Sequence, residues 1–383
     1  MTKPAGTVSL TPATFADLPG WASDDHLAAY RTFQRSCVRL IAAARTGNLA
    51  GKVATPLPLF AICQDALVKP LPKTRGAARE FFELSFAPHR VIHAGGQGLL
   101  TGYYEPLLEG SRKPTDRFTA PIYKRPADLI NLVHEAERGG VGANFTHARK
   151  TLKGVVPFAT RAEIEKGALK GLGLELLWLA DPVDVFFLQI QGSGRIRLPD
   201  GSMVRVHYDG KNGHPYSSIG RYLIDRGILP ADKLSMQALG RWLRSDPERA
   251  KPVMWHNASY VFFRELTGSE AESTLGVLEI PLTAGRSLAV DTSHHAIGSP
   301  VYVTSPTLTH ARTPNGFHRL MIAQDVGSAI RGPERGDIFF GSGDRAGGIA
   351  GITKHPGNFY VLLPRPVPSA TAPATPAPPV AKR

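Results

Sequence analysis

The chain has 383 residues, 42% hydrophobic and 20% charged, which is ordinary for a globular protein long enough for more than one domain. Lys and Arg (45) outnumber Asp and Glu (32), and the formal net charge of +13 suits either an acidic partner or a merely soluble basic surface. No zinc-finger spacing, RNP-like motif or basic heptad segment points to nucleic acid as a partner, and no run of about 18 apolar residues predicts a transmembrane helix.

The first hundred residues are predicted to be largely helical. An acidic pair, Asp24 and Asp25, precedes a segment in which apolar residues recur at helical spacing, as expected for a helix that begins near residue 26. The three expected helices are 26–45, 60–69 and 76–86, the last of which ends before Pro88.

Strands are predicted from Val91 onward, where short alternating segments are separated by turn residues. The segments 91–112 and 176–210 are both predicted to be strand-rich, and Pro-Asp-Gly at 199–201 predicts a hairpin turn in the second of them. Two short helices are expected afterwards, at 217–226 and 234–243.

The C-terminal third returns to short, β-branched segments separated by Gly and Pro, a pattern typical of a closed β-barrel. Residues 367–383 are rich in Pro and Ala and are predicted to form a disordered tail. The expected strands lie within 277–291, 299–305, 318–327, 336–343 and 358–365.

Cysteines, histidines and the N-terminus bear on metals and on the compartment. Cys37 and Cys63 are too few for a structural zinc site, and they fit either one disulfide in an oxidising compartment or two buried thiols in a reducing one. His294 and His295 have no third ligand at a useful spacing, so neither a metal nor another cofactor is expected.

The first ten residues lack the apolar region of a signal peptide, which indicates a cytosolic protein or a start downstream of a leader.

The strongest polar signal lies late in the chain. Asp325 follows an apolar strand and Asp337 begins the next one. A partly buried carboxyl group on such a rigid scaffold can keep its proton near neutral pH and act as an acid. The alternative is that both residues simply cap turns, as Asp often does.

A nearby glycine-rich stretch, 341–346, resembles a dinucleotide-binding fingerprint. That motif must open a helix and needs an acidic residue about 20 positions further on. Gly-rich sequence and Pro356 follow instead, so dinucleotide binding is not expected.

Three further clusters carry side chains suited to sugars, whose rings have an apolar face and a rim of hydroxyls. One of the adjacent Tyr103 and Tyr104 can face a groove. Gln189 and Gln191, two apart on an expected strand, would share one face, and Lys211 in a polar loop is available to an anion. Exposed sheet polarity and ordinary turn chemistry remain the alternative explanations.

Taken in order, these clusters resemble the MltA family of membrane-bound lytic murein transglycosylases over most of residues 95–365. No single motif is specific, but the ordered set is. The resembling segments are TGYYEP (101–106), PIYKRP (121–126), FFLQIQGSGRI (186–196), GKNGHPYSSIGRYLIDRG (210–227), NASYVFF (257–263), RLMIAQDVGSAIRG (319–332) and GDIFFGSGDRAG (336–347).

The resemblance implies a fold that is mainly β with an α-helical N-terminal part. A domain built on a double-psi β-barrel would be separated by a groove from an inserted second β-barrel domain. On this chain, 1–101 and 258–366 would form the large domain, and 102–257 would form the insertion.

The resemblance also implies site residues. Asp337 matches the family's catalytic acid and would be the single general acid/base, with Asp325 in support. No metal is implied. The implied substrate-binding residues are Thr101, Tyr103, Gln189, Gln191, Gly192, Ser193, Lys211 and Tyr216.

The implied activity is lytic cleavage of the MurNAc-β-1,4-GlcNAc bond of peptidoglycan, leaving 1,6-anhydroMurNAc ends, by a protein expected to be a monomer. Peptidoglycan bears carboxylates, which suits the basic charge. The alternatives are an inverting glycoside hydrolase that uses Asp325 or Asp344, and a non-catalytic peptidoglycan-binding module.

The resemblance also bears on localisation. Family members normally carry a signal peptide, often with a lipid anchor, and a start placed after the leader would account for this N-terminus. The implied location is periplasmic, in association with the outer membrane. Such a location would favour a disulfide between Cys37 and Cys63.

Overall fold

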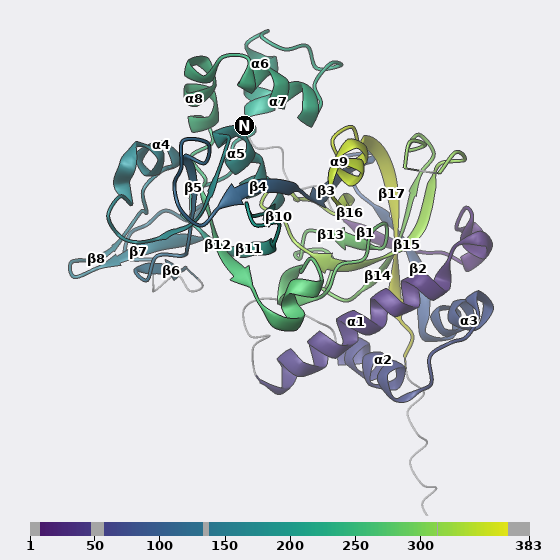
Figure 1. Cartoon of the computed structure of the whole chain (residues 1–383). Helices are drawn as coiled ribbons and strands as arrows, with labels where there is room; N and C mark the ends of the chain where they lie inside the picture. Colours follow the sequence, from purple (N-terminus) through teal and green to yellow (C-terminus); the bar gives the residue numbers. More distant parts are fainter. Residues whose placement is uncertain (1–7, 47–56, 133–137, 312, 367–383) are drawn as a thin grey trace, which may run out of the picture.

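The computed structural model describes residues 8–46, 57–132, 138–311 and 313–366 and is rich in β-sheet, with several helices on the outside (Figure 1). The predicted tail, 367–383, lies outside the described residues. Three named sheets occur in the described ranges, of eight, six and three strands. No helix in these ranges is both long and apolar enough to cross a membrane.

The eight-stranded sheet contains a closed ring of six strands. The eight strands of the whole sheet are β1 (Ser9–Pro12), β2 (Phe86–Ile92), β3 (Gly98–Glu105), β13 (Ser287–Ala289), β14 (Pro300–Ser305), β15 (Phe317–Asp325), β16 (Arg335–Ser342) and β17 (Lys354–Pro364). They follow the order β1-β2-β17-β14-β15-β13-β16-β3, and a further pairing of β17 with β3 closes the last six into a barrel. Within the ring, β13 with β15 and β16 with β3 are parallel pairs.

Three helices pack against the barrel: α1 (His26–Arg45), α2 (Leu57–Val68) and α3 (Arg75–Ser85) (Figure 1). Each lies where a helix was expected. Asp25 begins α1 because its side chain accepts a hydrogen bond from the backbone N–H of Ala28. Cys37 of α1 and Cys63 of α2 form a disulfide, which resolves the two alternatives for this pair. Strands β1 and β2, which sequence patterns did not predict, extend the barrel sheet beyond β17.

The six-stranded sheet lies in the middle of the sequence. It consists of β4 (Leu107–Ser111), β5 (Ala120–Tyr123), β9 (Glu175–Leu179), β10 (Ser193–Arg197), β11 (Met203–Lys211) and β12 (Val261–Leu266), in the order β12-β11-β10-β4-β9-β5. The end strands β12 and β5 contact each other. The predicted hairpin turn at 199–201 connects β10 and β11. A small sheet, β6 (Leu129–Asn131), β7 (His147–Thr151) and β8 (Gly154–Val156), lies alongside.

The prediction that 176–210 is strand-rich is wrong in its centre, where α5 (Pro182–Gln191) forms. Asp181 caps this helix by accepting a hydrogen bond from the backbone N–H of Val183, Pro182 occupies the first turn, and Gly192 ends the helix at φ +77°. These start and stop signals outweigh the continuous apolar run, which fits a buried helix as well as a buried strand.

The remaining helices differ from expectation in detail. α6 (Ile219–Asp225) and α7 (Met236–Arg244) lie at the two predicted positions, whereas α4 (Arg161–Glu163) and α8 (Pro247–Trp255) were not predicted. α9 (Asp344–Ala350) begins within the glycine-rich stretch 341–346, so the expectation that this stretch does not open a helix is wrong. Within 277–291, only Ser287–Ala289 is a strand.

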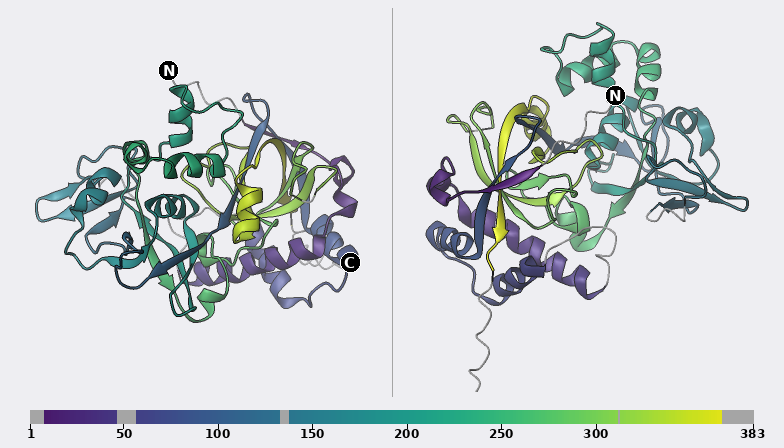
Figure 2. Two further views of the ribbon diagram at one scale, coloured as in Figure 1. Left: turned by 45° about the horizontal axis from the view of Figure 1, so that its top comes forward. Right: turned by 180° about the vertical axis from the view of Figure 1, so that it is seen from behind.

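β3 and β4 carry the chain from the barrel into the second sheet, with Pro106 between them (Figure 2). At this crossing the side chain of Glu105 is fully buried. Arg205 of β11 donates hydrogen bonds to both oxygens of Glu105, at 2.7 and 3.2 Å, and Ser342 of β16 donates to Oε2 at 2.7 Å. Arg205 also donates to the carbonyl of Ala271, just beyond β12, so one guanidinium contacts both connections between the sheets.

Candidate active site

The short strand β13 brings the two candidate aspartates into one site. Ala289 pairs with Asp325 of β15 on one side and with Asp337 of β16 on the other. Cross-strand partners point to the same face of a sheet, so both carboxyl groups flank the Ala289 methyl group. Residues that are twelve apart in the sequence therefore share one surface of the barrel.

Asp337 is partly buried and receives a hydrogen bond from Thr101, its cross-strand partner on β3. The hydroxyl oxygen of Thr101 lies 2.5 Å from Oδ1 of Asp337. Burial raises the pKa of Asp337, and the charge of Arg335 and the Thr101 hydrogen bond partly oppose this rise. A carboxyl group with a raised pKa can hold a proton close to neutral pH and deliver it to a substrate.

Asp325 is held by two donors. The phenolic hydroxyl of Tyr103 donates to Oδ2 at 2.8 Å, and the backbone N–H of Val326 donates to Oδ1 at 2.9 Å. Burial raises the pKa of Asp325 to about 6, against the lowering effect of these hydrogen bonds, and the negative charge of Asp337 raises it further. Among the described residues, Asp337 therefore receives one hydrogen bond, from a hydroxyl group, whereas Asp325 receives two and is more firmly fixed.

Tyr103 belongs to the support of this site. Its side chain is buried, and its ring packs against that of Phe339 with centroids 5.2 Å apart. The Tyr103 hydroxyl donates its proton to Asp325, so this hydroxyl contacts the second carboxyl group and does not face an open groove.

Comparison with known proteins identifies the family. Residues 99–264 match the MltA specific insert domain, and residues 286–363 match the 3D domain. Over 275 residues the chain is 34% identical to a membrane-bound lytic murein transglycosylase A of Escherichia coli (strain K12), a match that covers 71% of this chain and 67% of the relative. The chain belongs to the MltA family.

Other relatives agree with this assignment. A membrane-bound lytic murein transglycosylase A of Vibrio cholerae is 33% identical over 271 residues, and the match spans 70% of this chain and 66% of the relative, just under two thirds of its length. The crystal structure of a membrane-bound lytic murein transglycosylase from Agrobacterium tumefaciens superposes with a TM-score of 0.84 at 38% identity, covering 93% of this chain and 98% of that one. E. coli MltA with bound chitohexaose gives a TM-score of 0.63 at 26% identity, covering 95% and 94%.

The two glutamines lie on α5, so the expectation that they share one face of a strand is wrong. Gln189 is buried, and its Oε1 accepts a hydrogen bond from the fully buried Arg161. The side chain of Gln191 has a different partner: its Oε1 accepts a hydrogen bond from the backbone N–H of Tyr104 at 3.0 Å. In this MltA chain, Gln191 therefore connects α5 to β3, and Gln189 belongs to a buried polar cluster.

The other residues implied by the MltA resemblance lie near α5 and β11. Gly192 ends α5 in the left-handed conformation, and Ser193 begins β10 with a buried side chain. Burial raises the pKa of Tyr216. Lys211, at the end of β11, donates a hydrogen bond to Ser328 in the loop after Asp325, at 3.1 Å.

Sequence reasoning missed Arg161 and Arg335. Arg335 stands two residues before Asp337 on β16, so strand alternation could have placed both on one face of the barrel. Arg161 gave no such signal, because a buried arginine is unusual and its partners come from distant segments.

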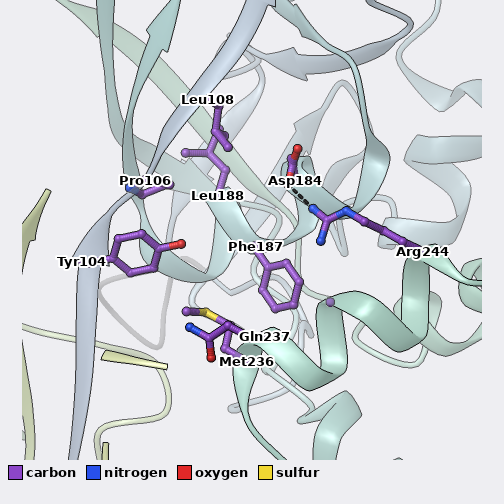
Figure 3. Close-up of a pocket in the computed structure, with 10 residues that line it drawn as sticks. Tyr104, Pro106, Leu108, Asp184, Phe187, Leu188, Met236, Gln237 and Arg244 are labelled. Atoms are coloured by element: carbon purple, nitrogen blue, oxygen red, sulfur yellow. Dashed lines mark hydrogen bonds and ion pairs between the residues drawn. The ribbon is translucent and has the colours of Figure 1, made fainter. Parts of the chain in front are cut away.

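A pocket of about 140 Å³ lies where β3, β4, α5 and α7 meet (Figure 3). Tyr104, Phe187 and Met236 approach one another in it, and Arg244 pairs with Asp184 at its edge. Tyr104 follows Tyr103 on β3, so this pocket opens on the opposite face of the strand from the two aspartates.

No group of three or more His, Cys, Asp or Glu side chains is arranged to bind a metal ion within 8–46, 57–132, 138–311 and 313–366. His294 lies in an exposed turn, whereas the side chain of His295 is buried and its Nε2 lies 2.6 Å from the carbonyl of Pro333.

Proposed function

We propose that this protein is a lytic transglycosylase that cleaves the MurNAc-β-1,4-GlcNAc bond of peptidoglycan and leaves 1,6-anhydroMurNAc ends, in cell wall turnover and remodelling. The observation that carries the proposal is the pairing of partly buried Asp337 with Thr101, on the barrel of a chain in a family whose members are named lytic murein transglycosylases. A relative that binds chitohexaose, a β-1,4-linked amino sugar chain, supports a glycan substrate.

In the proposed reaction, Asp337 acts twice. Its protonated carboxyl first donates a proton to the oxygen between MurNAc and GlcNAc, and the bond from that oxygen to MurNAc C1 breaks through an oxocarbenium-like transition state. The resulting carboxylate then takes the proton from the C6 hydroxyl of the same MurNAc, whose oxygen bonds to C1. One proton leaves Asp337 and one returns, and no water is consumed.

The intramolecular attack removes the need for a second catalytic carboxylate. A well-oriented group within the same molecule can contribute roughly 7–11 kcal/mol through proximity. Asp325 supports the site by holding Tyr103 against β16 and by adding negative charge beside the developing cation. An inverting hydrolase would instead use a second carboxylate to activate water.

The substrate-binding role of the residues around α5 and β11 is part of the proposal. Lys211 is the most direct candidate, because its ammonium group reaches the loop after Asp325 from the second sheet. Thr101 and Tyr103 contact the aspartates and would influence substrate through them. The remaining candidates are Gln189, Gln191, Gly192, Ser193 and Tyr216.

We further propose that the six-stranded ring is a double-psi β-barrel and that the second sheet is an inserted barrel. The ring's strand number and its two parallel pairings support the first, and the contact of β5 with β12 supports the second. Sheet membership favours counting β3 with the large domain and β12 with the insertion, a few residues beyond the expected division of 1–101, 102–257 and 258–366.

The expected setting is the periplasm, in association with the outer membrane, and the expected state is a monomer. The family's description as membrane-bound supports the first, as does the disulfide between Cys37 and Cys63, which fits an oxidising compartment. Purified protein that sediments as a dimer would contradict the expected monomeric state.

Digestion of purified sacculi, with mass spectrometry of the released muropeptides, tests the proposed function. Products lighter by one water than their reducing counterparts would establish the lytic reaction. Products ending in reducing MurNAc would identify a hydrolase, and sacculi that are bound but not cut would identify a binding module.

A further inference from the structure

Arg335 contacts the candidate acid through an intermediate hydroxyl. It lies two residues before Asp337 on β16, so both side chains lie on one face of the strand. Its Nη2 donates a hydrogen bond to Oγ1 of Thr101 at 2.9 Å. Its Nη1 donates to the carbonyl of Gly336 at 2.7 Å and reaches that of Leu99 at 3.4 Å. The guanidinium is therefore held in place on the strand pair that carries the acid.

These contacts decide the direction of the hydrogen bond between Thr101 and Asp337. Arg335 has only donors, so it must occupy a lone pair of the Thr101 hydroxyl. The proton of that hydroxyl then has one acceptor among the described residues, Oδ1 of Asp337 at 2.5 Å. Oδ1 accepts, and a transferable proton on Asp337 must be bound to Oδ2.

We propose that Arg335 is a positioning residue for Asp337: by fixing the orientation of the Thr101 hydroxyl, it confines the catalytic proton to Oδ2. The assignment rests on the proposed function of Asp337 as acid/base. It gives Thr101 a role in orienting the acid in addition to any contact with substrate. Arg335 itself acts only through Thr101 and the charge it brings to the site.

The arrangement suits a group that must both give and take a proton. Burial alone favours the neutral acid, which would donate poorly and leave a carboxylate that is poorly stabilised. The charge of Arg335 and the hydrogen bond from Thr101 both favour the carboxylate and so limit the rise in the pKa of Asp337. Loss of Arg335 should therefore move the pKa of Asp337 upward.

The test measures Asp337 with and without substrate. In protein labelled with ¹³C at aspartate Cγ, the Asp337 signal is assigned by its absence in Asp337→Asn and titrated in the wild type, Arg335→Met, Arg335→Lys, Thr101→Val and Thr101→Ser. The same proteins are assayed on sacculi for the pH dependence of kcat/KM. The exposed Arg197, changed to Met, serves as the matched control.

Arg335→Met should raise the titration midpoint of Asp337 by about 1 pH unit, the scale for a lost neighbouring charge. The limb on which kcat/KM falls with rising pH should move upward with it. Arg335→Lys and Thr101→Ser should remain close to the wild type, as should Arg197→Met. In a Thr101→Val background, Arg335→Met should shift the midpoint by less than it does in the wild type, because only the direct effect of the charge then remains.

Two results would overturn the proposal. One is an unchanged titration and pH profile in Arg335→Met; if that variant does not fold, agreement of Thr101→Val with Thr101→Ser has the same meaning. The other is an undiminished shift in the Thr101→Val background, which would mean that Arg335 acts on Asp337 by its charge alone and not through the Thr101 hydroxyl. The titration needs no substrate, so failure of the wild type to form anhydro products would reject the proposed function separately.

Discussion

Asp325 and Asp337 lie on opposite sides of Ala289, each paired with it from a different neighbouring strand of the barrel. Their strands are thus about 10 Å apart, twice the spacing of neighbouring strands, with only a methyl group between the carboxyls. Burial raises the pKa of both carboxyl groups. Among the described residues, both oxygens of Asp325 accept hydrogen bonds, whereas in Asp337 only Oδ1 does.

Asp337→Asn should lower the rate of muropeptide release by about 10³-fold, within the range that a positioned acid/base contributes. Folding should be unaffected, because the amide keeps an acceptor for Thr101. The exposed Asp344→Asn is the matched control and should retain wild-type activity. Near-normal turnover in a folded Asp337→Asn protein would reject Asp337 as the acid, and a large loss in Asp344→Asn would favour the hydrolase.

Asp325 should make stability depend on pH. Its pKa is about 6 in the folded protein and about 3.9 in the unfolded chain. The folded state therefore binds the proton more tightly, and the contribution of Asp325 to the free energy of unfolding falls as pH rises between these values. The free energy of unfolding of Asp325→Asn, relative to the wild type, should rise by up to about 3 kcal/mol from pH 4 to pH 7 in urea titrations. A difference that stays constant with pH would contradict the assignment.

Glu105→Gln should lower the free energy of unfolding by about 3 kcal/mol, because it removes the buried negative charge that pairs with both Arg205 and Arg195. Glu109→Gln, four residues after Glu105 on β4, is a matched control: its pair with Arg117 is exposed, so the change should stay below about 1 kcal/mol. Chemical denaturation of both variants gives the comparison. Equal effects would show that burial of Glu105 does not distinguish the two sites.

The double variant Cys37→Ser/Cys63→Ser should lose about 3.5 kcal/mol of stability, the value expected for opening a loop with a sequence separation of 26 residues. The specific activity of the folded variant should be unchanged, because the disulfide joins α1 and α2 on the outside of the barrel. Thermal melting of the wild type with and without a reductant checks the expected loss of stability. A reductant that leaves the melting temperature unchanged would contradict it.

Local signals in the sequence located many of the elements. The caps and apolar spacing of α1 and α3 are complete within each segment, and β14 and β15 are runs rich in apolar residues bounded by Gly and Pro. Asp325 and Asp337 were also visible as candidates, because Asp325 follows one expected strand and Asp337 begins the next, although their expected roles came from the family resemblance. Their common face was not, since it depends on three residues of β13 that no periodicity marks.

The glutamines show where local patterns misled. A run of apolar residues with Gln189 and Gln191 near its end fits a strand or a buried helix, and the capping signals at Asp181 and Gly192 decide for the helix. Arg335 and Arg161 illustrate a different limit. Their roles follow from partners on other strands, and only the folded chain brings these partners together.

The contacts of Arg205 at both connections have a consequence for how a glycan is received. Swinging the second sheet away from the barrel would pull this guanidinium from the buried Glu105 carboxylate and from the Ala271 carbonyl together. Losing a buried partner of this kind is unfavourable, so the two contacts favour the arrangement of the two sheets described above. Each of these contacts is kept only if the two sheets stay together, so they reduce the binding energy that a glycan would have to spend on holding the sheets in place.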